Sequence, residues 1–195
     1  MDFDQIRKLT IVALFSDDEL FERLVLKGGN ALNLVYRLTA RSSFDLDFSM
    51  EGDLAELPNA QDRIFRALRD RFDAAGFVLF DEKFEAKPKT LCEHQPPTWG
   101  GYQVSFKLIE RKRFEELGGK IEDIRRQSLV IGSGQRRVFT VDLSKHEYTA
   151  PKVSTELDHY TIYVYTPEMI SAEKLRAICQ QMPEYSPSVI TQKRP

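Results

Sequence analysis

The sequence has very few cysteines and no long apolar run, and these absences exclude several kinds of protein. Only Cys92 and Cys179 occur among its 195 residues. Two cysteines are too few for a disulfide framework, and neither has the paired spacing of zinc ligands. No apolar stretch approaches the roughly 18 residues of a transmembrane helix, and no signal peptide pattern is present. We therefore expect a cytoplasmic protein that does not enter the membrane.

Neither sign of charge is in large excess, because 28 basic and 30 acidic residues leave a net charge of −2. The basic residues are nevertheless clustered at residues 111–113, 125–126 and 136–137. Such clusters indicate a solvated helix face or, if they share one surface, contacts with the phosphates of RNA. The sequence does not show whether they converge.

Length and hydrophobicity predict one domain with a substantial core. The chain is 42% hydrophobic, and we expect a single domain over residues 1–195, with a core at about 20–165 and a C-terminal helix at 167–182. Apolar periodicity and turn residues predict the elements in order. In the first half they are helices at 3–15 and from 18, a strand at 24–27, a helix at 30–38, a strand at 44–48 and a helix from 58 that ends at Gly76. In the second half they are strands at 77–81 and 102–108, a helix or broken helix at 111–126 with a break at 118–119, strands at 136–144 and 160–165, and a helix from 167.

A glycine pair joins the first expected strand to the helix that follows it. Lys27, Gly28, Gly29 and Asn30 stand between an apolar run and a helical pattern. Such a turn lets backbone N–H groups approach phosphate oxygens, and Asn30 can cap the helix, whose N-terminus favours anions. An ordinary tight strand-to-helix turn has the same pattern. The segment is not a P-loop, since no Lys-Ser or Lys-Thr follows the glycines.

Two aspartates alternate with apolar residues some fifteen positions later. If residues 44–48 form a strand, Asp45 and Asp47 share one face while their apolar neighbours face the core. Their stems then lie roughly 6 to 7 Å apart, which allows both carboxylates to bind one or two Mg²⁺ or Mn²⁺ ions. A half-buried strand with one wet face shows the same alternation with no metal involved.

Together these segments resemble a known family. Residues 26–32 (LKGGNAL) followed by residues 41–48 (RSSFDLDF) are similar to the nucleotidyltransferase superfamily that includes DNA polymerase β, and more closely to its AbiEii branch. That branch contains toxins of type IV toxin–antitoxin and abortive-infection systems that act in phage defence. Its pattern has Thr where this chain has Asn30. The resemblance implies an α+β fold, with a mixed β-sheet flanked by helices as in polymerase β.

The resemblance assigns further site residues. Residues 165–177 resemble the family's third motif, a helix whose Lys174 is expected to reach the nucleotide phosphates. Arg41 and Ser43 precede the carboxylates, where they are expected to bind phosphate or fix the aspartates, or else to form loop structure. Polymerase β-like enzymes also place a third carboxylate on a neighbouring strand. Asp142 fits that pattern, although a surface acid at a strand end would look the same.

One family block has no counterpart. Members continue with a segment of the form Arg-x-x-Asp-hydrophobic-aromatic-Asp-hydrophobic, whereas this sequence stops at Pro195. We therefore expect either a truncated form or a shortened member, in which nucleotide binding is better supported than catalysis. The helix at 167–182 would then begin a truncated helical region.

The reaction implied is Mg²⁺- or Mn²⁺-dependent nucleotidyl transfer from a nucleoside triphosphate to an acceptor hydroxyl. Asp45 and Asp47 would hold the metal, Asp142 would assist the reaction, and Gly28, Gly29 and Lys174 would bind phosphates. The family often uses the 3′ end of transfer RNA as acceptor, and a cognate antitoxin is expected. Two alternatives use the same carboxylates, namely a catalytically impaired nucleotide-binding module and a metal-dependent phosphohydrolase.

Overall fold

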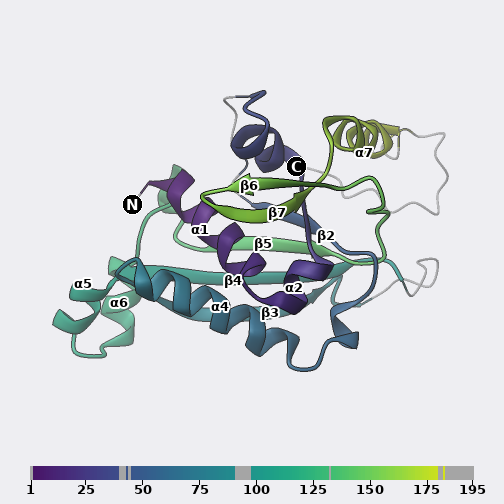
Figure 1. Cartoon of the computed structure of the whole chain (residues 1–195). Coiled ribbons are helices and arrows are strands. Elements are labelled where there is room, and N and C mark those ends of the chain that lie inside the picture. Colours follow the sequence, from purple (N-terminus) through teal and green to yellow (C-terminus); the bar gives the residue numbers. More distant parts are fainter. Residues whose placement is uncertain are drawn as a thin grey trace.

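The computed structural model describes residues 2–39, 43, 45–90, 98–131, 133–179 and 182 (Figure 1). Its helical elements alternate with strands as the sequence predicts, with some shifts in boundaries. The helices are α1 (Phe3–Phe15), α2 (Asp18–Arg23), α3 (Gly28–Asn30), α4 (Ala60–Ala74), α5 (Arg111–Glu116), α6 (Ile121–Gln127) and α7 (Pro167–Cys179), with a π-helical turn η1 (Ala31–Val35) and short 3₁₀ turns at Leu54–Glu56 and Ser133–Gln135.

Seven strands form one mixed sheet in the order β3-β4-β5-β2-β1-β7-β6. Neighbours are antiparallel except for the β2–β5 and β1–β7 pairs, which are parallel. The predicted α+β class with a mixed sheet flanked by helices is therefore confirmed. The strands are β1 (Val25–Lys27), β2 (Leu46–Ser49), β3 (Phe77–Lys87), β4 (Gly101–Glu110), β5 (Phe139–Ser144), β6 (Val153–Leu157) and β7 (Tyr160–Val164).

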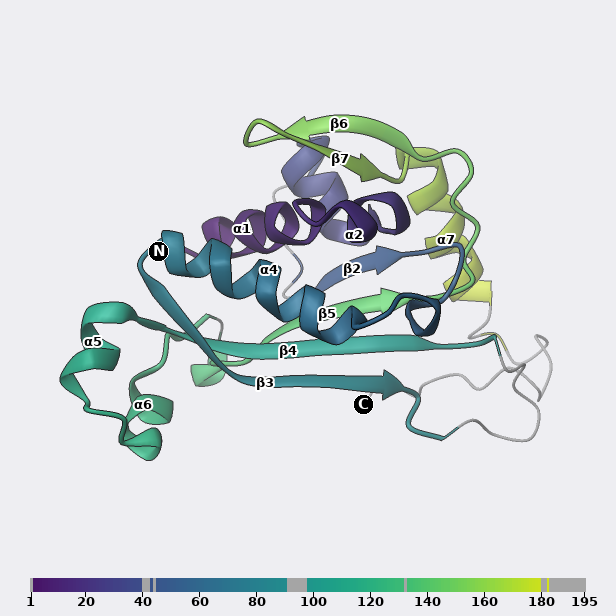
Figure 2. The ribbon, with the colours of Figure 1, turned by 60° about the horizontal axis from the view of Figure 1, so that its bottom comes forward.

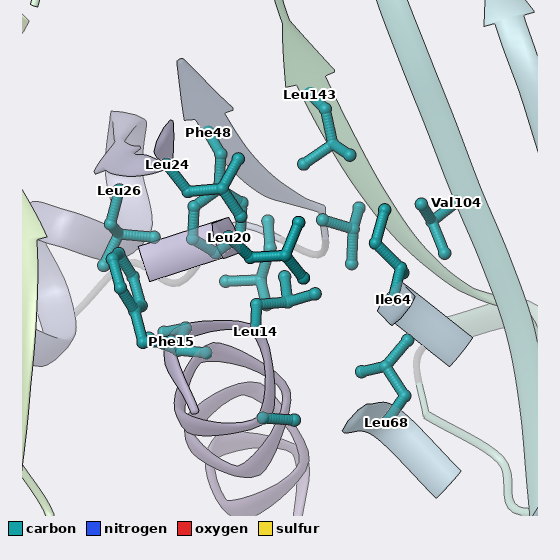
Figure 3. Packing of buried hydrophobic residues seen from close by; sticks show 14 of the residues in the cluster. Leu14, Phe15, Leu20, Leu24, Leu26, Phe48, Ile64, Leu68, Val104 and Leu143 are labelled. Carbon is teal, nitrogen blue, oxygen red and sulfur yellow. The ribbon is translucent and has the colours of Figure 1, made fainter. Parts of the chain in front are cut away.

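The sheet curves around two helices. Figure 2 shows α1 and α4 between the β6–β7 hairpin and the β3–β4 pair. Their apolar faces provide side chains such as Leu14, Ile64 and Leu68, which meet Phe48 and Val104 from the strands (Figure 3). Burying these side chains removes apolar surface from water and supplies most of the driving force for folding. Phe65 and Phe72 of α4 are buried in the same core.

Strand alternation sends polar side chains to the other face of the sheet. In β5, Phe139, Val141 and Leu143 are buried in the core, while Thr140 and Asp142 alternate with them and are partly exposed. This alternation follows from the two-residue repeat of a strand. The candidate site lies on this second face.

Several predicted boundaries were wrong. The helix expected at 30–38 begins instead at Gly28 and becomes π-helical over Ala31–Val35, because Tyr36 N donates to Ala31 O, five residues back. Asp45 precedes β2 rather than lying within it, and Phe44 falls outside the described residues. Strand β6 was not predicted, since its burial does not alternate clearly.

The helix end and the helix break predicted at glycines are confirmed. Gly76 ends α4 with φ +82°, and the helix after β4 is broken at Gly118 and Gly119, which both have positive φ. The fourth helix starts at Ala60 rather than Pro58. No helix in the described part of the chain is long and apolar enough to cross a membrane.

Candidate active site

A row of polar residues crosses four adjacent strands on the open face of the sheet. Lys27 on β1 is paired with Asp47 on β2, Asp47 with Asp142 on β5, and Asp142 with Gln103 on β4. Residues paired in this way have side chains within about 5.5 Å of each other at their stems. The register therefore brings two carboxylates side by side, with a lysine at one end of the row.

Asp47 occupies the centre of this row. The pKa of Asp47 is raised to about 7, chiefly by burial and also by repulsion from Asp142 and Asp45, although Lys27 opposes the shift. Among the described residues none donates a hydrogen bond to this carboxylate. The carboxylate oxygens of Asp47 receive no hydrogen bond from these residues and lie close to other carboxylates, so they are suited to bind a cation.

Gly28 lies directly against Asp47. A methyl group added at Gly28 would lie 2.7 Å from Oδ2 of Asp47, and the residue has φ +73°, so glycine is required both for space and for backbone conformation. Gly29 is less constrained, since the corresponding methyl would be 3.7 Å from Cβ of Ser43. The glycine pair thus lies between the two predicted site residues Asp47 and Ser43.

Asp142 has one direct partner. Gln103 Nε2 donates a hydrogen bond of 2.9 Å to Oδ1 of Asp142. Burial raises the pKa of Asp142 and Asp45 adds to the effect, while the Gln103 hydrogen bond and the charges of Lys87 and Arg136 lower it. The prediction that Asp142 stands beside the Asp-x-Asp strand is confirmed by the strand register.

Asp45 is held from β5 and from the segment before it. Its Oδ1 accepts from Arg136 Nη2 at 2.5 Å and also from the hydroxyl of Thr140. Arg136 Nη2 in turn donates to Thr140 Oγ1 at 2.6 Å. The side chain of Asp45 is 42% exposed, so it remains accessible from solvent.

Asn30 does not cap the helix, which corrects that prediction. It is fully buried, its side chain makes no cap hydrogen bond, and its Nδ2 donates to the backbone carbonyl of Asp45 at 2.7 Å. Its amide oxygen accepts from the guanidinium of Arg7, another fully buried residue. The structure therefore places Asn30 beneath the site.

At the lysine end of the row, Lys27 contacts a side chain of α7. Lys27 Nζ donates to Ser144 Oγ at 3.1 Å and lies 3.7 Å from Oε1 of Glu173. Glu173 Oε1 also lies 3.7 Å from Nη2 of Arg176 on the same helix. Lys174, one residue on, is exposed and forms no ion pair with the described residues.

A cavity of about 680 Å³ opens beside Asp142. Its lining includes Lys87, Trp99, Lys145 and Arg176. This volume is within the range of small-molecule binding sites. The cavity adjoins the row on the side away from Lys27, because Gln103 and Asp142 are part of its wall.

The predicted basic clusters do not act as one free surface. Most of their arginines pair with acidic residues nearby: Arg111 with Asp73, Arg113 with Glu116, Arg125 with Asp81 and Glu122, and Arg126 with Asp123. Arg136 instead reaches the site. The solvated-face interpretation therefore fits clusters 111–113 and 125–126, whereas 136–137 contains a site residue.

Among the described residues, we find no group of three or more His, Cys, Asp or Glu side chains arranged to hold a metal ion. The donor chemistry still fits a divalent cation, because the charges of Asp45 and Asp142 raise the pKa of Asp47, and the charge of Asp45 also raises the pKa of Asp142. A cation would relieve that repulsion.

Most of the predicted site residues come together. Lys27, Gly28, Gly29, Ser43, Asp45, Asp47 and Asp142 lie along β1, β2, β5 and the turn between them, while Arg41 lies outside the described residues. Sequence reasoning missed Arg136, Thr140 and Gln103. Thr140 shares a face with Asp142 by simple alternation and could have been found in that way; the other two depend on the strand register.

Comparisons with known proteins identify a family and similar solved structures. A family model described as nucleotidyl transferase AbiEii toxin, type IV TA system, matches residues 10–187. Two H. pylori crystal structures, a candidate nucleotidyltransferase and JHP933, have TM-scores of 0.48 and 0.48, with 19% and 20% identity over 89% and 90% of this chain. The chain covers only 56% and 55% of those two proteins. No curated protein matches.

Proposed function

This chain belongs to the AbiEii nucleotidyl transferase toxin family of type IV toxin–antitoxin systems, and we propose that it is a metal-dependent nucleotidyltransferase acting on a nucleoside triphosphate. The observation that carries the proposal is the juxtaposition of Asp47 and Asp142 in register, with Gly28 against the Asp47 carboxylate. The arrangement joins a carboxylate pair to a turn whose backbone can approach phosphates.

Asp45 and Asp47 would hold one or two Mg²⁺ or Mn²⁺ ions. Such an ion supplies neutralisation of triphosphate charge and orientation of the reacting groups. Since Asp45 is bonded to Arg136 and Thr140, its participation requires exchange of these partners. Asp47 accepts no hydrogen bond from the described residues, so its carboxylate could bind a cation without giving up a partner.

The triphosphate would bind at the Lys27 end of the row. Backbone N–H groups at Gly28 and Gly29 and the hydroxyl of Ser43 can donate to phosphate oxygens. Lys27 provides a partly buried cation, with 12% of its side chain exposed, and Lys174 an exposed one on α7. Arg41 is assigned to phosphate by its place in the family motif.

The acceptor would enter from the cavity beside Asp142. Asp142 is suited to take the proton of the attacking hydroxyl, because burial and Asp45 raise its pKa above that of an ordinary aspartate. The hydroxyl then bonds to the α-phosphorus, the bond to the pyrophosphate oxygen breaks, and pyrophosphate leaves. Transfer RNA as acceptor and a cognate antitoxin are proposed from the family.

The test is nucleotide transfer measured together with binding. Each labelled ribonucleoside triphosphate is incubated with the protein, Mg²⁺ and bacterial RNA, and thermal unfolding is followed for the same mixtures. A ligand at about a hundred times its dissociation constant adds about 2.7 kcal/mol of stability. Label on RNA that is lost in Asp47→Asn supports the proposal.

The alternatives give different results in the same experiment. Stabilisation by a triphosphate without any transfer indicates a nucleotide-binding module, and release of nucleoside monophosphate without an acceptor indicates a phosphohydrolase. A protein that neither binds nor turns over any triphosphate contradicts all three. The chain spans about half the length of the two structures it matches.

A further inference from the structure

Arg7 is a charged residue in the interior of the protein. It belongs to α1, and its side chain is 0% exposed. Isolated buried charges are costly, so a buried arginine is expected to have several acceptors. Arg7 contacts the carboxylate of Asp4, the amide oxygens of Asn30 and Asn33, with Nη2 to Asn33 Oδ1 at 3.2 Å, and the ring of Phe3.

Two of these contacts converge on the segment around the glycine pair. Asn30 directly follows Gly29 and is 0% exposed, and Asn33 lies one turn further along. Asn33 Nδ2 donates to the carbonyl of Thr39 at 2.7 Å, at the end of the described segment that precedes the aspartates. Arg7 therefore reaches the turn that binds phosphates in the proposed function and the chain that leads towards Asp45.

The hydrogen bond from Arg7 determines the orientation of the Asn30 amide. A guanidinium can only donate, so the Asn30 atom facing it must be the oxygen. The amide nitrogen then points the other way, towards the carbonyl of Asp45, to which it donates at 2.7 Å. The two hydrogen bonds form one relay from α1 to the backbone of the first aspartate.

We propose that Arg7 and Asn30 are a buried positioning pair. The pair fixes the backbone of Asp45 and so determines the orientation of its carboxylate. The inference rests on the proposed function, because it assigns the pair to the cation site. Asp45 precedes β2, so no strand pairing within β2 fixes its position. The relay supplies that restraint from below, while Arg136 and Thr140 bond its carboxylate from β5.

The pair also explains the asparagine that replaces the family's threonine. A threonine hydroxyl is shorter, whereas an asparagine amide offers an acceptor and a donor on opposite sides of one rigid plane. Loss of residues that orient a metal ligand commonly lowers metal affinity 10- to 100-fold. Such an effect is separable from a loss of stability.

The test is Mn²⁺ binding, measured by the electron paramagnetic resonance signal of free Mn²⁺, in the full chain without nucleotide. The variants are Arg7→Met, Asn30→Leu, the double variant and Asn30→Thr. We expect about a ten-fold weaker Mn²⁺ affinity for each disruptive single variant. The double variant is expected to lose no more than the worse single one, because both act through one relay.

Asn30→Thr has a hydroxyl too short to reach both Arg7 and the carbonyl of Asp45, and it is expected to bind Mn²⁺ about as weakly as Asn30→Leu. This variant keeps the proposal falsifiable if Arg7→Met does not fold. The matched control is Arg63→Met, which removes the 2.9 Å pair with Asp17 on the same helical layer but away from the site. It is expected to lower the unfolding temperature without changing Mn²⁺ affinity.

The outcomes separate the two proposals. If the unaltered protein binds no Mn²⁺ and Asp47→Asn behaves identically, the proposed metal-dependent function is wrong. If the unaltered protein binds Mn²⁺ and the folded Arg7→Met and Asn30→Leu proteins bind it equally well, the positioning pair is overturned. Weakened binding in these variants, with the Arg63→Met control unchanged, supports it.

Discussion

Gly28 and Asp47 are so close that no other residue type fits between the β1 strand and the carboxylate. A methyl group on Gly28 would meet Oδ2 of Asp47 at 2.7 Å, and the backbone there has φ +73°. Gly28→Ala is therefore expected to destabilise the fold by roughly 1 to 3 kcal/mol and to displace Asp47. Thermal unfolding and nucleotide transfer measure the two effects.

Gly29→Ala is the matched control for that substitution. Its methyl would lie at ordinary contact distance, 3.7 Å from Cβ of Ser43. It is expected to leave the unfolding temperature nearly unchanged while weakening triphosphate binding, since the methyl projects where phosphate would approach. Equal destabilisation by the two alanines would contradict this account of the turn.

Asp47 is expected to make the metal-free protein less stable as the pH rises. The folded-state pKa of about 7 lies above the ordinary 3.8, so folding favours the protonated form. Its stabilising contribution is complete below about pH 4 and is lost as the pH rises through 7. Asp47→Asn should then stabilise the protein at pH 8 by an amount on the order of 3 kcal/mol, and much less at pH 5.

Denaturant unfolding in a chelator at both pH values measures this difference. The exposed carboxylate of Asp158, which is 51% exposed, provides the control variant Asp158→Asn, for which no pH-dependent gain is expected. Nucleotide transfer should disappear in Asp47→Asn despite the added stability, as is common for residues kept for function. A variant that is less stable at pH 8 than the unaltered protein would count against a buried, crowded carboxylate.

Arg136 is expected to compete with a metal for Asp45. It lies 2.5 Å from the Asp45 carboxylate and also lowers the pKa of Asp142. Arg136→Met should therefore lower the unfolding temperature without metal, and Mg²⁺ should then raise that temperature by several degrees more than it does in the unaltered protein. Unfolding scans with and without Mg²⁺ provide the measurement.

The neighbouring arginine supplies the control for this experiment. Arg137 donates to the carbonyl of Ser128. Arg137→Met is expected to change stability without changing the increment that Mg²⁺ provides. An identical Mg²⁺ increment in both variants would show that Arg136 does not compete for the site.

The sequence predicted the parts of the site that depend on local pattern. Gly28 and Asp47 stand in two short motifs, at residues 26–32 and 41–48, and the position of Asp142 follows from strand alternation with Phe139, Val141 and Leu143 in the core. Elements with strong periodicity, such as α1 and α4, were also predictable, since burial of one apolar face requires a helical repeat.

The remainder depends on contacts between distant parts of the chain. Arg136 and Asp45 are separated by 91 positions, and Arg7 and Asn30 by 23. Neither pair is implied by local spacing, because each requires the packing of α1 or the parallel register of β2 and β5. Asn30 is likewise buried and bonded to Arg7 and to the carbonyl of Asp45 instead of capping the helix, which the local sequence does not indicate.

Asp53 is expected to stabilise the fold at neutral pH and to lose this effect in acid. Burial would raise its pKa, but hydrogen bonds from the Ala55 backbone, Lys145 and Tyr102 lower the pKa of Asp53 to about 2. Its stabilising contribution is present above about pH 4 and is lost as the pH falls towards 2. Asp53→Asn should cost roughly 1 to 2 kcal/mol at pH 7 and little near pH 2.

Urea unfolding between pH 2 and pH 7 tests this dependence. Tyr102→Phe is the companion variant, because it removes only the hydroxyl that donates to Asp53 at 2.6 Å. It should show the same pH dependence with a smaller amplitude. A constant difference between Asp53→Asn and the unaltered protein at all pH values would contradict a charged role for Asp53.

Lys27 and Lys174 are expected to differ in what they stabilise. Lys27 is 12% exposed and lies between Ser144 and Glu173, whereas Lys174 is exposed and forms no ion pair with the described residues. Lys27→Met should therefore lower stability by roughly 1 to 2 kcal/mol, because it removes a partly buried cation from the hydroxyl of Ser144 and the carboxylate of Glu173. Lys174→Ala should change stability by less than about 0.5 kcal/mol.

Kinetics distinguish the two lysines further. If Lys174 binds the triphosphate, Lys174→Ala should raise the KM for the nucleotide several-fold while the unfolding temperature without nucleotide stays constant. Lys27→Met should lower kcat as well, because the positive charge that opposes the raised pKa of Asp47 is lost. If Lys174→Ala leaves KM and kcat unchanged while Lys27→Met raises KM, the triphosphate is bound by Lys27 and not by Lys174. That result would contradict a role for Lys174 in the site.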